Sequence, residues 1–230
     1  MKILLDTANL NDIRYFNEHY PILGVTTNPT ILSKEGGDVI KLLLEIRSII
    51  GDDKELHVQV TETEFERIVE EAEAIVSLLG KNTYVKIPAT DIGLRATKCL
   101  SNKGIGVTVT AVLSAAQAML ASNAGASYVA PYISRSENLC ADGVGIVDNI
   151  VKIFNVSGSK TQILAASFKT AKEVLDVAVV GCHAATIGSA IMQILNSHTT
   201  TDTSIKGFEK DWKAAFGNTT LLSLIKERQA

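Results

Sequence analysis

Apolar and polar positions along the chain follow two alternating periods. Short runs rich in β-branched apolar residues are separated by longer stretches in which apolar residues recur at helical spacing. Residues 64–80 show the second period, because their apolar side chains would fall on one face of a helix that Gly80 ends. The runs that we predict as strands lie at residues 2–6, 22–28, 56–60, 83–88, 105–110, 127–132, 161–168 and 183–187.

This alternation predicts the fold class. Eight strand–helix units within about 195 residues fit an α/β fold of the (β/α)8 type, the TIM barrel, better than an open doubly wound sheet. No GxGxxG motif follows the first run, so the sequence does not favour a dinucleotide-binding domain. We therefore expect one barrel domain over residues 1–198.

The C-terminal part of the chain follows a different pattern. Residues 196–204 read as a polar linker, and short helices are expected over residues 205–217 and 220–229. One face of the first helix carries Ile205, Phe208, Trp212 and Phe216. We expect residues 199–230 to form a helical extension that packs on the barrel or on a neighbouring subunit, because this apolar face needs a partner.

Composition and charge exclude several classes of function. A formal net charge of -3 and the lack of a basic run argue against nucleic-acid binding. Cys99, Cys140 and Cys182 are far apart and form no CxxC motif, as expected of reduced thiols. Charges interrupt residues 1–16, and polar residues interrupt the long, mainly apolar stretch 111–130. Neither a signal peptide nor a membrane span is therefore predicted. These features indicate a soluble cytoplasmic protein.

Polar residues stand at the expected carboxyl ends of most predicted strands. They are Asp6, Asn28, Gln59, Lys86, Thr110, Tyr132 and Ser167, spaced by about one strand–helix unit each. Because a barrel carries its active site at the carboxyl ends of its strands, these groups should converge there. The two-residue period also places His57 on the strand face of Gln59, and Thr108 on that of Thr110.

Taken singly, these residues also have structural interpretations. Asp6 could cap the following loop, and Tyr132 could be a core aromatic residue. Turn, strand or helix-start roles would fit Thr26, Asn28, Thr108, Thr110 and Ser167, and Lys169 could be a solvated charge. Lys86 is harder to explain, because Val85 and Ile87 flank it and a buried ammonium is costly unless it is paired, for example with Asp6.

A Schiff-base nucleophile is the functional interpretation of Lys86. Desolvation in an apolar strand lowers the pKa of a lysine, so that the neutral amine can attack a ketone. The resulting iminium is an electron sink that allows a neighbouring C–C bond to break or form. The necessary proton transfers require a carboxylate and hydroxyl groups, and Asp6, Gln59, Thr110 and Tyr132 are side chains of suitable types.

Several motifs together resemble the small transaldolases and fructose-6-phosphate aldolases. The resemblance runs through nearly the whole chain, including FEKDWKAAFG near its C-terminus. The motifs are LDT (5–7), GVTTNPTI (24–31), VKIPAT (85–90), GVTVTAVLSAAQA (106–118), YVAPYISR (128–135) and AASFK (165–169). The resemblance implies class I aldol chemistry on a dihydroxyacetone unit in a (β/α)8 barrel, without a metal ion or organic cofactor. It also implies a homo-oligomer built of pentameric rings, commonly a decamer.

The resemblance assigns roles to individual residues. Lys86 on the fourth strand is the Schiff-base lysine, and Asp6 assists proton transfers and binds substrate hydroxyls. Thr26 and Asn28 contact the ketose hydroxyls, and Arg135, Ser167 and Lys169 hold the phosphate of the acceptor aldehyde. Phosphate binding also has a physical basis, because Arg135 offers a fork of donors and Ser167 would open a helix whose N-terminus favours anions. A solvated surface arginine is the alternative for Arg135.

Two positions bear on the type of reaction. Transaldolases of this family usually carry Glu where this chain has Gln59 and Phe where it has Tyr132, whereas the fructose-6-phosphate aldolases carry Gln and Tyr. We therefore expect an aldolase that cleaves or forms fructose 6-phosphate from dihydroxyacetone and glyceraldehyde 3-phosphate. The alternative is a transaldolase of the pentose phosphate pathway that transfers the dihydroxyacetone unit between sugar phosphates.

Two other classes of protein remain as hypotheses. A metal-dependent barrel enzyme would need clustered His and carboxylate ligands at strand ends, but only His57 lies on a suitable strand face. A non-catalytic sugar-phosphate-binding barrel would need Arg135 and Ser167 but not the reactive set, whose presence speaks against it.

Overall fold

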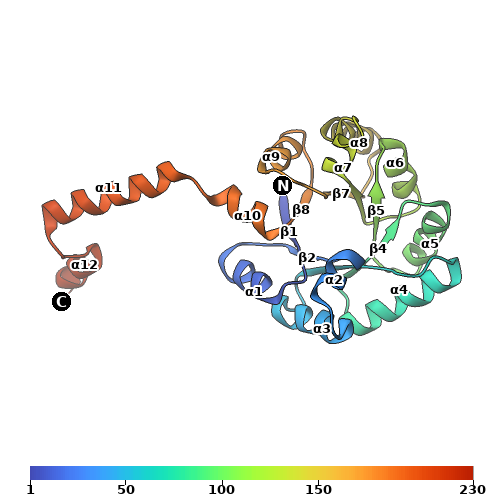
Figure 1. Cartoon of the computed structure of the whole chain (residues 1–230), viewed down its shortest axis with the longest axis horizontal. Helices are drawn as coiled ribbons and strands as arrows, with labels where there is room; N and C mark the ends of the chain where they lie inside the picture. The colour runs from blue at the N-terminus through green and yellow to red at the C-terminus, as the bar shows by residue number, and fades with distance from the viewer. Residues whose placement is uncertain (230) are drawn as a thin grey trace. The chain divides into compact units, whose positions relative to one another are not determined.

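Eight parallel strands close into a barrel in the computed structural model, which describes residues 1–229 (Figure 1). Each strand pairs with the next along the chain, and β1 (Lys2–Asp6) pairs with β8 (Ala184–Ile187) to close the ring. The strands between them are β2 (Gly24–Thr26), β3 (Glu55–Gln59), β4 (Thr83–Pro88), β5 (Val107–Val112), β6 (Tyr128–Pro131) and β7 (Gln162–Ala165). The predicted (β/α)8 barrel is confirmed.

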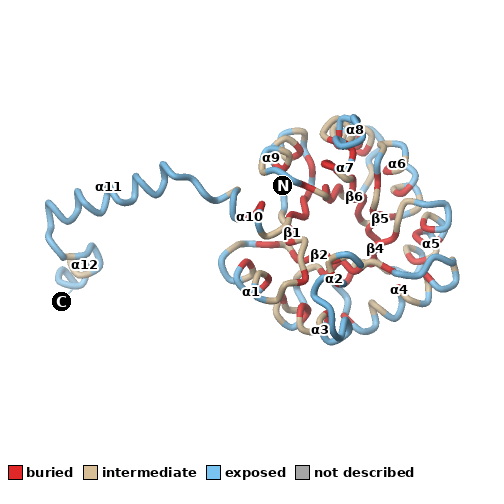
Figure 2. The backbone as a smooth tube through the Cα atoms, in the orientation of Figure 1, coloured by how far each residue is buried: buried red, intermediate tan, exposed pale blue. Residues whose placement is uncertain are grey.

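Helices surround the strands and bury one face each, as the colours of Figure 2 show. They are α1 (Leu10–His19), α2 (Pro29–Glu35), α3 (Val39–Ile50), α4 (Phe65–Leu79), α5 (Asp91–Asn102), α6 (Ala115–Asn123), α7 (Ile133–Glu137), α8 (Gly143–Ser157) and α9 (Ala171–Val179), with α10 (Ser189–Asn196) after β8. Helix α4 confirms the helix predicted over 64–80: Ile68, Ala72 and Leu79 are buried, and Gly80 follows with a φ of 88°. The short helices α2 and α7 were not expected.

Strand β4 shows how the two-residue period builds the site. Val85 and Ile87 are fully buried between the strand and the surrounding helices. Lys86 therefore points into the barrel, where its side chain lines a cavity at the carboxyl ends of the strands. Val85 and Ile87 therefore pack the strand against the helices, and the Lys86 side chain is available for reaction in the cavity.

A register irregularity interrupts the pairing of β5 with β6. The pairing shifts between Val109 and Val112, and Ala111 has a φ of 56°, in the left-handed region. The strand predicted over 105–110 is observed at Val107–Val112, so it begins and ends two residues later than expected. This bulge lies directly beside Thr110, so it sets the direction in which the end of β5 meets the cavity.

Three of the residues predicted to end strands lie just beyond them. Asn28 is the N-cap of α2, and Tyr132 is the N-cap of α7 and bridges to Ala166. Ser167 lies two residues after β7 with a φ of 63°. Their strands end earlier than predicted because the backbone at the rim of the barrel adopts helix-cap and loop conformations.

A second compact unit begins at Gln193, after a barrel unit that spans Met1–Met192. It contains α11 (Thr199–Phe216) and α12 (Leu221–Gln229). The linker predicted over 196–204 is wrong from residue 199 onward, where α11 begins. The hydroxyls of Thr203 and Ser204 donate to the carbonyls four residues earlier, so a hydroxyl-rich stretch typical of a loop is accommodated within a helix.

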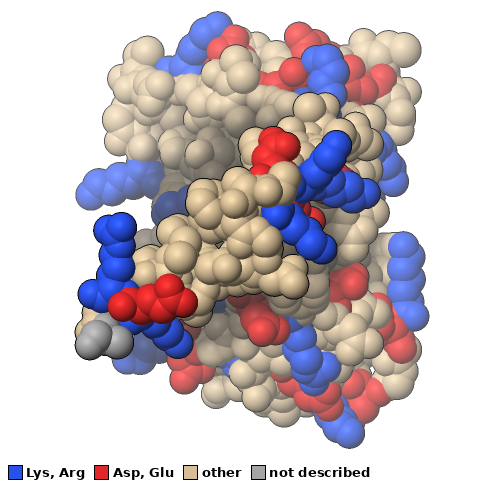
Figure 3. Space-filling model, turned by 90° about the vertical axis from the view of Figure 1, so that its left-hand side faces the viewer, with Lys and Arg blue, Asp and Glu red and all other residues tan. Residues whose placement is uncertain are grey.

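The surface carries charges of both signs. Lys and Arg side chains alternate with Asp and Glu over the face seen in Figure 3, in keeping with the small net charge. Among residues 1–229, no helix combines the length and the apolar character needed to cross a membrane.

Candidate active site

A cavity of about 670 Å³ lies at the carboxyl ends of the strands. Its wall is built from inward side chains of the barrel and from the loops that follow β2, β6, β7 and β8. The predicted site residues that line it are Asp6, Thr26, Asn28, Lys86, Thr110, Tyr132, Arg135, Ser167 and Lys169. The structure therefore brings together side chains that are up to 163 residues apart in sequence, from Asp6 to Lys169.

Lys86 is buried, with 5% of its surface exposed. Its Nζ donates a hydrogen bond to the carbonyl oxygen of Thr27 at 2.7 Å. Burial lowers the pKa of Lys86, and the charge of Asp6 opposes this shift. The ion pair with Asp6 that would explain a buried lysine structurally is replaced by a hydrogen bond to a neutral carbonyl. The Lys86 ammonium therefore loses its proton more readily than that of an exposed lysine.

Asp6 is oriented by a chain of hydroxyl groups. Thr26 donates to Oδ1 of Asp6 at 2.6 Å, so its oxygen is left to accept from Thr186, whose Oγ1 lies 2.7 Å away. Thr186 also lines the cavity. Thr186 was not among the residues predicted for the site, although its inward position in the predicted strand 183–187 was a usable signal. The arrangement holds one carboxylate oxygen and leaves the other for a ligand.

Asn28 performs the structural role that was the alternative to ligand binding. Its side-chain oxygen accepts from the backbone N–H of Ile31 at 3.0 Å and so caps α2. The side-chain oxygen is engaged in this cap, while the NH2 group of the same amide is a donor for a ligand in the cavity. The structural and the functional interpretation are therefore compatible.

Thr110 and Tyr132 form a hydroxyl pair on one wall of the cavity. Thr110 Oγ1 and the Tyr132 hydroxyl lie 3.2 Å apart. The Tyr132 ring also lies under the guanidinium of Arg135, with Cζ 4.6 Å from the ring centroid. Tyr132 thus connects a proton-carrying hydroxyl pair with the cation that was predicted to bind phosphate.

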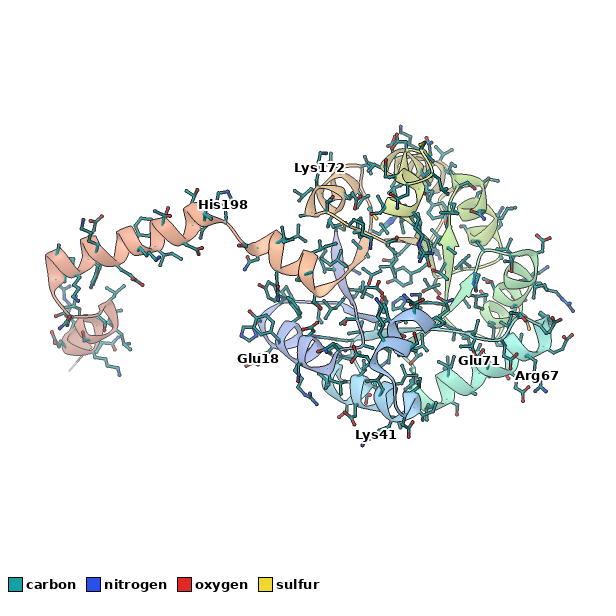
Figure 4. The ribbon with its side chains drawn as sticks, in the orientation of Figure 1. Glu18, Lys41, Arg67, Glu71, Lys172 and His198 are labelled. Carbon is teal, nitrogen blue, oxygen red and sulfur yellow. The ribbon has the colours of Figure 1, made fainter. Side chains whose placement is uncertain are left out.

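Gln59 is placed differently from the other predicted site residues. It pairs with Lys86 across β3 and β4, but among the described residues it stands outside the lining of the cavity. The loop that follows it is held by Glu71 of α4, labelled in Figure 4, which accepts from the backbone of Thr61 and Glu62 and from the Thr61 hydroxyl. Gln59 therefore lies beside Lys86 on the inner face of the barrel, next to the residues that line the cavity.

The expected anion site at a helix N-terminus is wrong in its details. Ser167 does not open a helix: α9 begins at Ala171, capped by Thr170 and Glu173 in a capping box. Glu173 also accepts from the backbone N–H of Lys169 and from the Ser134 hydroxyl. Anion binding at this rim would therefore depend on the side chains of Arg135, Ser167 and Lys169. The T-x-x-E spacing at 170–173 was the overlooked signal.

Further polar side chains line the same cavity. Thr30 and Lys34 come from α2, and Ser189 comes from the start of α10. The buried Oγ of Ser189 has no hydrogen-bond partner among the described residues. Within the same residues, no group of three or more His, Cys, Asp or Glu side chains is arranged to hold a metal ion.

The chain is similar to proteins of one family. Residues 3–220 match the model of the family described as Transaldolase/Fructose-6-phosphate aldolase. A "Probable transaldolase" of Clostridium acetobutylicum is 41% identical over 216 residues, which cover 94% of this chain and 99% of that protein. A "Probable transaldolase" of Agathobacter rectalis is 39% identical over 218 residues, covering 95% of this chain and all of that protein.

More distant solved structures share the fold alone. The structure titled "Native KDPGal structure" aligns with a TM-score of 0.57 at 13% identity, over 81% of each chain. A putative dihydrodipicolinate synthase family protein from Coccidioides immitis aligns with a TM-score of 0.60 at 11% identity, over 80% of this chain and 65% of that one. The family match over residues 3–220 and the relatives at about 40% identity establish more than the fold. They show that the chain belongs to the transaldolase/fructose-6-phosphate aldolase family.

Proposed function

We propose that this member of the family is a class I aldolase that cleaves and forms fructose 6-phosphate through a Schiff base on Lys86. The observation that carries the proposal is a buried amine of lowered pKa on the wall of a cavity that also contains a carboxylate and a hydroxyl pair. These are the groups that imine formation and aldol cleavage require.

The reaction begins with attack of the Lys86 amine on C2 of the ketose. Loss of water from the carbinolamine gives an iminium. The C3–C4 bond then breaks: its electron pair moves into the iminium to give an enamine, and the proton of the C4 hydroxyl passes to a base. Asp6 is the carboxylate in the cavity that can accept this proton. Glyceraldehyde 3-phosphate leaves at this stage.

The fate of the enamine decides between the two activities of the family. An aldolase protonates C3 and lets water release dihydroxyacetone and the free amine. The hydroxyl pair of Thr110 and Tyr132 supports this course, because a tyrosine hydroxyl can relay a proton to the enamine. A transaldolase keeps the enamine for a second aldehyde, and the names of the relatives support this second candidate.

Borohydride reduction tests the proposal directly. With fructose 6-phosphate present, reduction should attach one dihydroxyacetone-derived unit to Lys86 and inactivate the protein irreversibly, because the reduced amine cannot be hydrolysed. Peptide mass spectrometry locates the label, and reduction without sugar is the control. A label on another lysine, or none, would disprove the Schiff-base assignment.

Arg135→Ala should mainly weaken the binding of phosphorylated aldehydes. A charged hydrogen bond to phosphate contributes about 1.5–3 kcal/mol, so the KM of glyceraldehyde 3-phosphate should rise by roughly 10- to 150-fold. Unphosphorylated glyceraldehyde should be affected much less. Equal losses for both aldehydes would mean that Arg135 only supports the structure of the rim.

The α11 helix is proposed to contact a second copy of the chain. Phe208 is 72% exposed and Phe216 51% exposed, and Trp212 packs against Phe216 with ring centroids 4.5 Å apart. An apolar face of this kind needs a partner. We expect sedimentation to show a ring-based oligomer, commonly a decamer, and Phe208→Glu to produce smaller species. A stable monomer of the unaltered 24.6-kDa chain would contradict this expectation.

A further inference from the structure

A cluster of buried and half-buried polar side chains lies in the barrel below the cavity, and the proposed mechanism does not use it. This floor cluster consists of Glu55, His57, Tyr84, Thr108 and Tyr128. His57 and Thr108 are completely buried, which is unusual for polar residues in a barrel interior that branched apolar side chains normally fill. Polar groups buried as deeply as His57 and Thr108 need hydrogen-bond partners, so placing them there is costly unless they have a role.

The hydrogen bonds of the floor cluster have a definite direction. The Glu55 carboxylate accepts from the Tyr128 hydroxyl at 3.0 Å and faces Nε2 of His57 at 3.1 Å. Because a carboxylate only accepts, Nε2 carries the ring proton and Nδ1 is left as an acceptor. Nδ1 lies 2.8 Å from Thr108 Oγ1, so Thr108 is the donor of this bond. Burial lowers the pKa of His57, against the effect of Glu55 and together with that of Lys86, which agrees with a neutral ring.

The bond between His57 and Thr108 joins two strands that are not neighbours. His57 lies on β3 and Thr108 on β5, with β4 between them. His57 pairs in register with Tyr84, and Thr108 pairs in register with Lys86. The bond therefore crosses the inner face of β4 obliquely, from the level of Tyr84 at its His57 end to the level of Lys86 at its Thr108 end. The His57 ring is stacked on the Tyr84 ring, with 4.8 Å between the centroids and 15° between the planes. This stacking holds the His57 ring in its orientation.

We propose that the His57–Thr108 hydrogen bond fixes the segment of β4 from which the Lys86 side chain extends, and so directs its amine toward the substrate carbonyl. We call this bond the brace. His57 and Thr108 are positioning residues, because they act through Lys86 and do not line the cavity in the described part of the chain. The functional reading rests on the proposed Schiff-base role of Lys86. A lysine has a long, flexible stem, and a misplacement of about 1 Å can cost roughly 100-fold in rate.

The test compares two substitutions of Thr108. Thr108→Val keeps the shape and removes the hydroxyl, whereas Thr108→Ser keeps the hydroxyl. Thr108→Val should lower kcat and the rate of borohydride trapping at Lys86 by about tenfold, with the KM of fructose 6-phosphate changed by less than about twofold. Thr108→Ser should restore both rates to within about twofold of the unaltered protein. Equal losses in both variants, or no loss in Thr108→Val, would overturn the brace.

Removal of the bond from the other side supplies the second comparison. His57→Phe keeps a ring against Tyr84 and Tyr128 but has no nitrogen, so it should match Thr108→Val. The double variant should be no slower than either single variant, because the same bond is lost only once. Additive losses would overturn the proposal. Because the two substitutions break one bond from opposite ends, either one decides the question where the other fails to fold.

Glu55→Gln separates the brace from an effect of charge. The glutamine amide can donate to Nε2 of His57, which then donates through Nδ1 to Thr108, so the bond persists with its direction reversed. The kcat should stay within about threefold of the unaltered protein. A loss as large as that of Thr108→Val would mean that the carboxylate charge matters instead. If the unaltered protein itself is not trapped at Lys86, the proposed function fails; if it is trapped and the variants equal it, only the brace fails.

Discussion

Replacement of Lys86 by arginine is expected to abolish turnover. A guanidinium stays protonated and cannot attack a ketone, whereas the buried Lys86 amine has a lowered pKa. The loss of kcat should be on the order of 10⁴-fold or more, as expected when a covalent nucleophile is removed. Release of dihydroxyacetone from fructose 6-phosphate measures it, together with the absence of a borohydride adduct.

A lysine outside the cavity supplies the matched control. Lys172 lies on the exposed face of α9, where it pairs with Asp176, and it is labelled in Figure 4. Lys172→Arg should leave both turnover and trapping unchanged. Retained activity in Lys86→Arg, or transfer of the label to Lys34 or Lys169 in the cavity, would show that another amine forms the Schiff base.

The second large effect is expected at Tyr132. Tyr132→Phe removes the hydroxyl that lies 3.2 Å from Thr110 and so removes the proton relay to the enamine. Release of free dihydroxyacetone should fall by about 10²–10⁴-fold, the usual contribution of a general acid–base group. The phenyl ring still lies under Arg135, so binding of phosphorylated substrates should be retained.

Addition of Gln59→Glu to Tyr132→Phe should favour transfer of the dihydroxyacetone unit to a second aldehyde over its release. Gln59 pairs in register with Lys86, so a carboxylate at this position would lie beside the lysine that carries the adduct. We expect the double variant to keep its adduct longer and to form more sedoheptulose 7-phosphate from erythrose 4-phosphate. Both products are measured on the same preparations. If the unaltered protein already transfers faster than it cleaves, the aldolase assignment fails and the enzyme is a transaldolase.

The strand–helix rhythm was predictable because it follows from local rules. A buried parallel strand shows as a short apolar run, and a surface helix shows as a 3.6-residue period, so both can be recognised within a few residues. The ends of the elements were less certain. The Asn28 cap ended β2 early, and the end of β5 passes through an irregularity at Ala111, because caps and bulges depend on backbone geometry that a hydrophobic pattern does not encode.

The reactive side chains were predictable for a similar reason. Position at the end of a strand, together with the two-residue period, placed Asp6, Lys86 and Thr110 on one rim of the barrel. Ser167 was assigned to a helix start that lies at Thr170 instead, and Ser189 was not considered at all. Ser167 lies in the loop after β7 and Ser189 is the first residue of α10, positions where no period relates sequence to side-chain direction.

The sequence by itself determined that the chain forms a barrel and that a buried lysine stands among proton-carrying groups at its rim. Only the tertiary structure decided which group each side chain meets. Lys86 donates to the carbonyl of Thr27, 59 residues away, and His57 meets Thr108 across an intervening strand. Closure and register of the barrel create such contacts between distant segments. A pattern that repeats every two or 3.6 residues contains no information about them.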